Sequence, residues 1–452
     1  MSSLDASPQP AILSPHEPET LAPAAARANL ITVGAAHAVI HGVSILMPLI
    51  YPILHQSYGF SYTELGLIGT ASSLAGGLLQ VVFGYVSRSI PRKVLIGVGN
   101  LVVAVATLLT ATATTFVPWL GWSALRGVGG APQHPAGNSI LTDSYGERRR
   151  GFAIAAHVAG GNIGTLLVPF VGLALIQNFG WQPALIVFAL PGLAAGSAVL
   201  LLTREPSQPA GAEDARRTPR EGDAERGVGA HGVRPPHGVR PVRAEARPTL
   251  GQRLAELLAP LRHRGVLLVI LASMVAAGGR GLGILTKYLP LYLEGPLHMA
   301  AGTVTPLYTL LLAGSVVGPL LAGRYSDRTG RKPILLAAYG LSAVFTLLVP
   351  LLFGGGAALP LLVALIGLLG LVVYCESPLL QAYLVDNSDP AQRDAAVGWY
   401  FTLAFGVGSL WDVILGTLID HSGSFIPAFA LMAVSYIAAG AIVLFIPRSR
   451  NA

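Results

Sequence analysis

Long apolar runs alternate with short polar segments along most of this chain. An α-helix needs about 20 apolar residues to cross the hydrocarbon core of a bilayer. Because a helix pairs its backbone polar groups internally, such runs predict an all-α membrane protein with twelve transmembrane helices in two six-helix bundles. The twelve runs are 30–54, 62–86, 94–114, 117–141, 152–176, 181–202, 266–290, 303–323, 333–353, 358–384, 394–418 and 424–446.

The polar segments divide the chain into five parts. Residues 1–29 are rich in Pro, Ala and Ser and lack the basic start and apolar core of a cleaved signal peptide, so we predict a disordered cytoplasmic tail. The two bundles are predicted at 30–203 and 265–447, with a short cytoplasmic tail at 448–452. The linker between the bundles, 204–264, is rich in Arg, Pro and Gly, and its apolar content is too low for it to fold alone.

This linker is predicted to be a disordered cytoplasmic tether, and its arginines are expected to be attracted to anionic lipid head groups. It contains the pentapeptide His-Gly-Val-Arg-Pro twice, starting at His231 and at His237. A metal-binding or regulatory role for these two histidines stays open as an alternative. The last part, about 250–261, has the spacing of a helix that lies along the membrane surface.

Composition agrees with a membrane protein, because 52% of the residues are hydrophobic and only 11% are charged, against about a quarter in soluble domains. The formal charge of +7 is no sign of a nucleic-acid partner, since the arginines lie in loops between the apolar runs. Cys375 is the only cysteine, which excludes an intrachain disulfide and argues against a cysteine-based metal cage. We predict no cofactor and no metal ion.

Lys and Arg gather in the loops on one side of the predicted helices. They follow the second, fourth, eighth and tenth helices, whereas the opposite loops carry Glu64, Glu294 and Asp420 and almost no Lys or Arg. Cytoplasmic loops of membrane proteins carry the excess of basic residues. Both termini and the linker are therefore predicted to be cytoplasmic.

Ionisable side chains inside the apolar runs are candidates for function, because each costs a few kcal/mol or more at the bilayer centre. His37 and His41 are four residues apart on one helical face, and His41 is the stronger candidate for binding a substrate or a proton. Arg126 needs an anion, a carboxylate or carbonyl partners. Arg280 lies in a glycine-rich stretch that lets a helix loosen or pack closely, and Lys287 follows seven residues later on the same face.

Two carboxylates, Glu376 and Asp412, lie in the predicted spans of the second bundle. Each can neutralise an arginine or exchange a proton, and a structural role is an equal alternative. With His41 they are the predicted proton-coupling residues. Two or three fixed positive charges against two carboxylates favour an anionic or zwitterionic small-molecule substrate.

A cationic turn closes the second apolar run of each half. The stretch Gly323–Lys332 reads Gly-Arg-Tyr-Ser-Asp-Arg-Thr-Gly-Arg-Lys, and a degraded copy occupies 84–93. The stretch resembles the loop signature of the major facilitator superfamily, in which an Asp pairs with Arg and a helix N-terminus to hold two bundles in one state. The predicted latch residues are Gly323, Asp327, Arg328, Gly330, Arg331, Lys332, Gly84, Arg92 and Lys93.

Three further stretches narrow the resemblance to the fosmidomycin-resistance branch of bacterial exporters. They are the first helix with His37 and His41, then Gly129-Gly-Ala-Pro-Gln-His-Pro135 with its His134-Pro135 pair in the fourth helix, and His157-Val-Ala-Gly-Gly-Asn-Ile-Gly164 in the fifth. The resemblance implies two pseudo-symmetric halves, a central cavity and proton-driven export across a bacterial inner membrane. It adds His134 and Asn162 as cavity candidates; the alternatives are a proline kink at His134 and helix packing at Asn162.

Two departures from the family pattern have consequences. The first loop copy has Arg88 in place of its Asp and Pro91 in place of its second Gly, so the usual carboxylate latch is missing there. His41 occupies the place of an Asp that the family tends to have, which changes both charge and proton affinity at that site.

These observations predict a secondary active transporter, acting as a monomer among membrane lipids, most consistent with proton-coupled export of a small organic anion or antibiotic-like compound. No G-x-x-x-x-G-K-[ST] loop is present, so the proton gradient and not ATP is the predicted energy source. Import or exchange of an anionic metabolite is the first alternative. A polytopic membrane enzyme is a remote one, because no nucleophile–base pair is recognisable.

Overall fold

The computed structural model describes residues 21–87, 89–145, 149–205, 251, 255, 258–389 and 392–447. Most of the N-terminal tail, most of the linker with its two His-Gly-Val-Arg-Pro repeats, and the C-terminal tail lie outside the described residues, as does Arg88. The predictions for those segments therefore stay predictions.

The first half is a bundle of helices that follow the first six apolar runs. The elements are α1 (Pro23–Tyr58), α2 (Tyr62–Val86), α3 (Arg92–Thr110), α4 (Phe116–Gly130), α5 (Gln133–Tyr145), α6 (Arg150–Leu167), the π-helical turn η2 (Val168–Gly172), α7 (Leu173–Phe179) and α8 (Trp181–Leu202). Helix α1 begins at Pro23, seven residues before the predicted start, because a helix can continue beyond the apolar stretch that measures the membrane, and proline suits its first turn.

The second half repeats this order after the short 3₁₀ turn η3 (Ala259–Arg262). Its elements are α11 (Arg264–Ala276), η4 (Ala277–Gly279), η5 (Gly281–Leu285), α12 (Thr286–Glu294), α13 (Ala301–Thr329), α14 (Arg331–Gly354), α15 (Leu359–Val373), α16 (Glu376–Asp386), α17 (Arg393–Tyr400), η7 (Phe401–Gly406), η8 (Val407–Ser409), α18 (Leu410–Ser422) and α19 (Ile426–Leu444).

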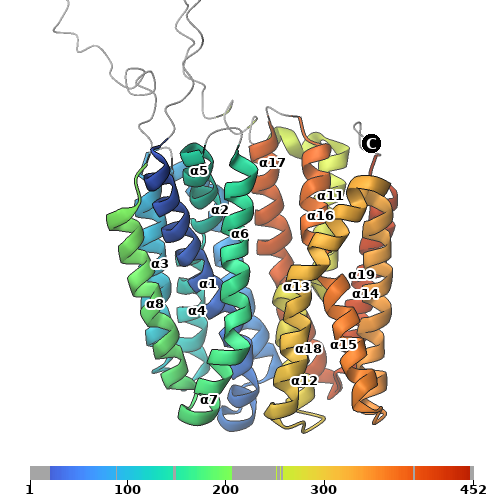
Figure 1. Ribbon diagram of the computed structural model, residues 1–452. Helices are drawn as coiled ribbons and strands as arrows, with labels where there is room; N and C mark the ends of the chain where they lie inside the picture. Colours follow the sequence, from blue (N-terminus) through green and yellow to red (C-terminus); the bar gives the residue numbers. More distant parts are fainter. Residues whose placement is uncertain are drawn as a thin grey trace, which may run out of the picture.

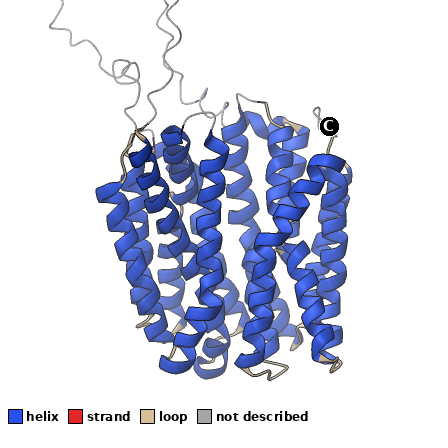
Figure 2. Ribbon diagram, viewed as in Figure 1, coloured by secondary structure: helices blue, strands red, loops and turns tan. Residues whose placement is uncertain are grey.

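Within the described residues, eleven helical segments are long and apolar enough to cross a membrane. The twelfth predicted crossing is formed by α4 and α5, which are interrupted at Ala131 and Pro132. Proline lacks the backbone N–H that a continuous helix needs, which accounts for the interruption. The described residues contain no strand (Figure 2), so the predicted all-α, twelve-helix architecture is confirmed.

The two halves stand side by side with their helices roughly parallel to one another (Figure 1). The start of α1 and the end of the described chain lie at the same end of the bundle, which we call the terminal side. Large apolar side chains such as Leu201, Leu320 and Ile437 are 60–81% exposed on the outer helices. An apolar exterior of this kind suits a lipid environment.

The halves pack against each other chiefly along α2 of the first half and η7, η8 and α18 of the second. Glycines allow this close approach: a Cβ added to Gly406 would lie 3.3 Å from the backbone of Gly77. Side-chain hydrogen bonds cross the seam near these glycines, among them Thr70 Oγ1 to the Ser409 carbonyl at 2.8 Å and Thr402 Oγ1 to the Gly77 carbonyl at 3.1 Å.

On the side opposite the termini, a carboxylate fastens the seam. Asp420, at the end of α18, accepts hydrogen bonds from the backbone N–H groups of Tyr62 (3.0 Å) and Thr63 (2.7 Å) at the start of α2. An anion at a helix N-terminus is favoured by the helix dipole and by the unpaired N–H groups there. On the terminal side, the ion pairs of the described residues lie within one half (Arg92–Asp143, Arg331–Asp386 and Arg331–Asp327).

Candidate transport site

The helix that carries Arg280 is broken in the middle of its span. The sequence predicted that the glycines around Arg280 let this helix loosen, and the structure confirms it: α11 gives way to η4, and Leu282 and Gly283 have non-helical backbone angles. Gly283 has φ +119°, a conformation that L side chains rarely adopt. Interrupted helices near the bilayer midplane are typical of transporter binding sites.

This break also changes the relation between Arg280 and Lys287. The prediction that the two cations share one helical face is wrong, because the helical phase is lost at Leu282 and Gly283 between them. Each cation instead reaches a different carboxylate of the same half, as described next.

Arg280 is 7% exposed, and each nitrogen of its guanidinium donates a hydrogen bond to the protein. Its Nε donates to Glu376 Oε1 at 2.9 Å, and its two terminal nitrogens donate to the carbonyls of Ala404 and Ser273, each at 2.8 Å. The guanidinium also lies 4.3 Å from the centre of the Phe405 ring. The pair therefore joins the broken helix to α16 and η7.

Lys287 and Asp412 form the second ion pair, with Nζ 2.5 Å from Oδ2. The pair belongs to the second half, but it faces α2 of the first half, where a Cβ added to Gly69 would lie 2.6 Å from Lys287 Nζ. The other Asp412 oxygen, Oδ1, is buried and has no hydrogen bond among the described residues. This charge pair therefore lies directly at the seam that must part if the halves move.

Arg126 is buried to the same degree as Arg280, at 7% exposure, yet its surroundings are different. Its guanidinium donates to Thr110 Oγ1 at 2.8 Å and to Ser123 Oγ at 2.6 Å. Within the described part of the chain no carboxylate lies within ion-pair distance of it. A guanidinium offers five N–H donors, so two hydroxyl partners leave donors for an anion.

Four histidines of the first half form a cluster at the seam. The His37 ring lies 4.5 Å from His41, 5.0 Å from His134 and 4.1 Å from His157, between ring centres. His134 also stacks on Phe401 of η7 at 5.6 Å, which is a contact with the second half. We call His37, His41, His134 and His157 the histidine cluster.

The predicted site residues thus fall into a charged group and the histidine cluster. The sequence did not identify one member of the cluster, His157, as a site residue. In the sequence His157 only begins the family-like stretch 157–164, but in the structure it is fully buried, and both of its ring nitrogens lack hydrogen bonds among the described residues. Asn162 is half-buried and has no hydrogen bond to described residues, so its packing and cavity roles both stay predictions.

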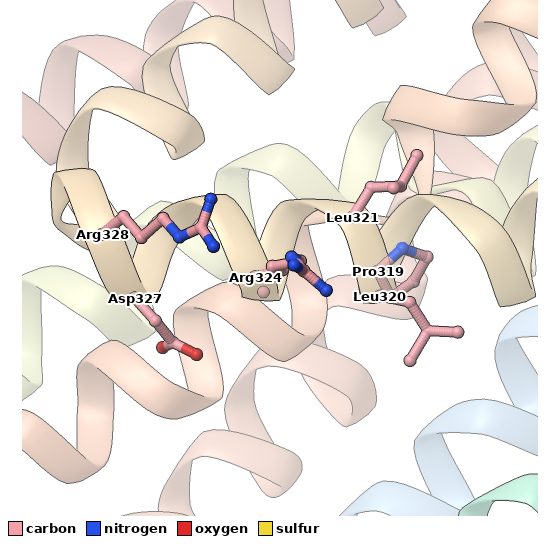
Figure 3. A pocket seen from close by; sticks show the side chains of 7 residues that line it. Pro319, Leu320, Leu321, Arg324, Asp327 and Arg328 are labelled. Carbon is pink, nitrogen blue, oxygen red and sulfur yellow. The ribbon is translucent and has the colours of Figure 1, made fainter.

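The cationic turn of the second half is formed as its sequence requires. Gly330 has φ +86° and ends α13, and Lys332 Nζ bonds the carbonyls at the end of α19 (Leu444, 2.6 Å). Arg331 contacts both Asp386 and Asp327. A surface hollow beside the turn combines the apolar Pro319, Leu320 and Leu321 with Gly323, Arg324, Asp327 and Arg328 (Figure 3).

The fold and this set of buried charges define a class of protein, a secondary transporter built from two helical halves. The sequence model of the Major Facilitator Superfamily matches residues 34–311 and 288–452. The chain belongs to this superfamily. It is accordingly a multi-pass membrane transporter and not an enzyme.

Two relatives that are distant in sequence match more than four fifths of the chain. The chain is 23% identical to the fosmidomycin resistance protein of Escherichia coli, over 93% of this chain and 97% of that protein. It is 24% identical to a probable sulfoacetate transporter, SauU, of Cupriavidus necator, over 83% of each. The crystal structure of the nucleoside transporter NupG superposes with a TM-score of 0.69 at 13% identity, covering 93% of this chain and 98% of that one.

Proposed function

We propose that this protein exports a small organic anion in exchange for protons, by alternating access between the two sides of a bacterial inner membrane. The observation that carries the proposal is Arg126, a buried cation with hydroxyl partners and no carboxylate within ion-pair distance among the described residues. Arg280, which is equally buried, and Lys287, whose side chain is 12% exposed, are each paired with a carboxylate. An anionic substrate supplies the charge that Arg126 lacks.

The second part of the proposal assigns proton coupling to Asp412. A carboxylate that changes its protonation state at the seam alters the charge balance where the halves meet. One Asp412 oxygen is paired with Lys287, and the other is buried without a hydrogen-bond partner among the described residues, so it can take a proton. Glu376 has the same arrangement toward Arg280, and with His41 it remains a further predicted coupling residue.

Direction and orientation complete the proposal. Export is supported by the similarity to a protein named for fosmidomycin resistance. The basic residues of the described loops, among them Arg92, Lys93, Arg331 and Lys332, lie on the terminal side, which supports a cytoplasmic location for both termini. We propose that the protein acts as a monomer.

Import of an anion together with a proton is the second candidate, and the Lys287–Asp412 pair favours it. Protonation of Asp412 would leave the Lys287 ammonium without its counter-ion and so prepare it for a substrate anion. The similarity to a protein named as a probable sulfoacetate transporter points the same way, because sulfoacetate is an anion.

Everted membrane vesicles with a pH-sensitive dye distinguish export in exchange for protons from import together with a proton. The lumen of such vesicles is acidified, and a panel of small carboxylates, sulfonates, phosphonates and anionic antibiotics is then added outside. Export coupled to protons predicts that one class of anion discharges the gradient only when the protein is present. A proton-coupled importer gives no discharge in this assay but accumulates the anion in right-side-out vesicles.

The role of Arg126 is tested in the same vesicles. Arg126→Gln removes the unpaired charge and is expected to lower the anion-dependent discharge at least about tenfold, the effect of losing one strong charge-assisted contact. Arg27→Gln is the matched control, because Arg27 is exposed at the start of α1. Full activity of folded Arg126→Gln would contradict the proposed site.

A further inference from the structure

The histidine cluster brings three imidazole nitrogens close together at the seam between the halves. One ring nitrogen from each of His37, His41 and His134 lies within 4.8 Å of the others. His37 and His41 are one helical turn apart on α1, and His134 comes from α5, so two elements converge on one point. Imidazoles about a turn apart on a helix, with a third from a neighbouring element, are a common arrangement of transition-metal ligands.

Hydrogen bonds fix which nitrogen each first-helix histidine presents. His37 Nδ1 is 2.9 Å from the His157 carbonyl, and a carbonyl can only accept, so Nδ1 carries the proton. The neutral ring then has its lone pair on Nε2, which is buried and has no partner among the described residues. A buried lone pair without a donor is costly unless a proton or a metal ion fills it.

His41 is held in the same way by a threonine. Thr165 Oγ1 donates to the Gly161 carbonyl at 3.3 Å and lies 3.3 Å from His41 Nδ1, so its hydroxyl oxygen accepts from that N–H. The lone pair of neutral His41 is thereby left on Nε2 as well. A carbonyl or hydroxyl behind a histidine is the usual support of a metal ligand, because it sets the tautomer and orients the ring.

The backbone provides space for these rings. A Cβ added to Gly161 of α6 would lie 2.9 Å from His37 Cε1, so glycine is required there if His37 is to keep its position. His41 and His134 are only half-buried, which leaves their rings freer to turn. Tetrahedral ligation at about 2.0–2.1 Å needs nitrogens roughly 3.4 Å apart, so modest ring rotation from the present positions suffices.

We propose that His37, His41 and His134 bind a divalent first-row transition-metal ion such as Zn²⁺, Ni²⁺ or Co²⁺, with His37 and His41 as ligands through Nε2. Imidazole ligands select this class of metal over Mg²⁺ or Ca²⁺, which prefer oxygen. Because His134 also stacks on Phe401 of the second half, the metal site includes a residue that contacts the other half. The proposal does not depend on which anion is transported or on Arg126.

The test is a titration of the purified full-length protein with Co²⁺, whose visible absorption identifies nitrogen ligation. The protein carries a purification tag without histidine, and every sample has His231→Gln and His237→Gln so that the linker histidines do not contribute. One equivalent of Co²⁺ is expected to bind with d–d absorption bands, and Zn²⁺ is expected to displace it.

Two kinds of variant separate ligands from bystanders. His41→Ala and His134→Ala are expected to weaken Co²⁺ binding at least about tenfold, and Thr165→Val, which keeps the shape but removes the support, by about 10–100-fold. His55→Ala and His298→Ala lie outside the cluster and are expected to bind as the parent protein does. Absence of binding in protein that elutes as a single folded species, or binding unchanged by His41→Ala and His134→Ala, would overturn the proposal.

Discussion

Arg126 and Arg280 show how much the same residue type depends on its neighbours. Both are 7% exposed, but Arg280 is bonded to Glu376, Ser273 and Ala404, whereas the partners of Arg126 within the described residues are hydroxyl groups. Arg280 therefore fits best as a clamp that holds the broken helix in place, and Arg126 as the charge that receives a substrate. Substitution of Arg280 is therefore expected to lower the stability of the protein, and substitution of Arg126 is expected to lower transport.

The clamp makes a stability prediction. Arg280→Gln leaves the Glu376 carboxylate buried without its partner, and breaking a buried pair in this way costs about 3–5 kcal/mol. Thermal unfolding in detergent is expected to occur at clearly lower temperature for Arg280→Gln than for Arg27→Gln. The double variant Arg280→Met/Glu376→Met removes both charges and is expected to recover part of the loss. Wild-type thermal stability of Arg280→Gln would show that the pair is no clamp.

At this scale the sequence identifies the residues but not their partners. Each ionisable residue in a predicted span is recognisable because charge is rare there. Which carboxylate each cation pairs with is not recognisable from the sequence. Arg280 and Glu376 are 96 positions apart and Lys287 and Asp412 are 125 apart, and only the packing of helices brings them together. His157 is missed for a similar reason, because its importance comes from the stacked His37 and not from its neighbours in sequence.

At the scale of elements, the broken helix α11–η4–η5–α12 is the feature with most consequence. The break needs a residue with φ near +119° at position 283, which only glycine adopts at low cost. It turns the chain so that Arg280 and Lys287 reach separate carboxylates. The geometry of the charged group thus depends on one glycine.

Gly283→Ala tests this dependence. The alanine Cβ is disfavoured at that backbone conformation by about 1–3 kcal/mol, so the break is expected to shift and the protein to lose both thermal stability and transport. Gly340→Ala in α14 is the matched control, because a Cβ there meets no atom within 4 Å and the glycine has no positive φ. Equal stability and transport of the two variants would mean that the break does not need this conformation.

The elements themselves follow from the sequence more fully than their interruptions do. Twelve apolar runs gave twelve crossings, because the length of an apolar run is set by the bilayer. The interruption at Ala131 and Pro132 and the π-helical turns η2 and η7 are not visible in the apolar pattern. These interruptions depend on local backbone geometry and helix packing, which do not change how apolar the run is.

At the scale of the whole molecule, the seam between the halves is fastened most clearly on the side away from the termini. Asp420 bonds the start of α2 there, while the ion pairs of the cationic turns on the terminal side stay within one half in the described chain. Among the described residues, the latch predicted between the bundles makes no ion pair across the seam. Alternating access requires the Asp420 side to open during transport.

A reversible cross-link on that side shows whether the seam must open there during transport. Thr63 of α2 and Thr417 of α18 have hydroxyl oxygens 3.3 Å apart, so cysteines at both positions are placed to form a disulfide. The pair Thr63→Cys/Thr417→Cys is made in a Cys375→Ser background, oxidised with diamide and assayed for anion-dependent proton discharge in vesicles. Each single cysteine serves as the control.

We expect that oxidation stops transport by the double variant, that reductant restores it, and that neither single variant responds. Transport that continues at the wild-type rate while the disulfide is demonstrably formed would contradict the claim that this seam must open.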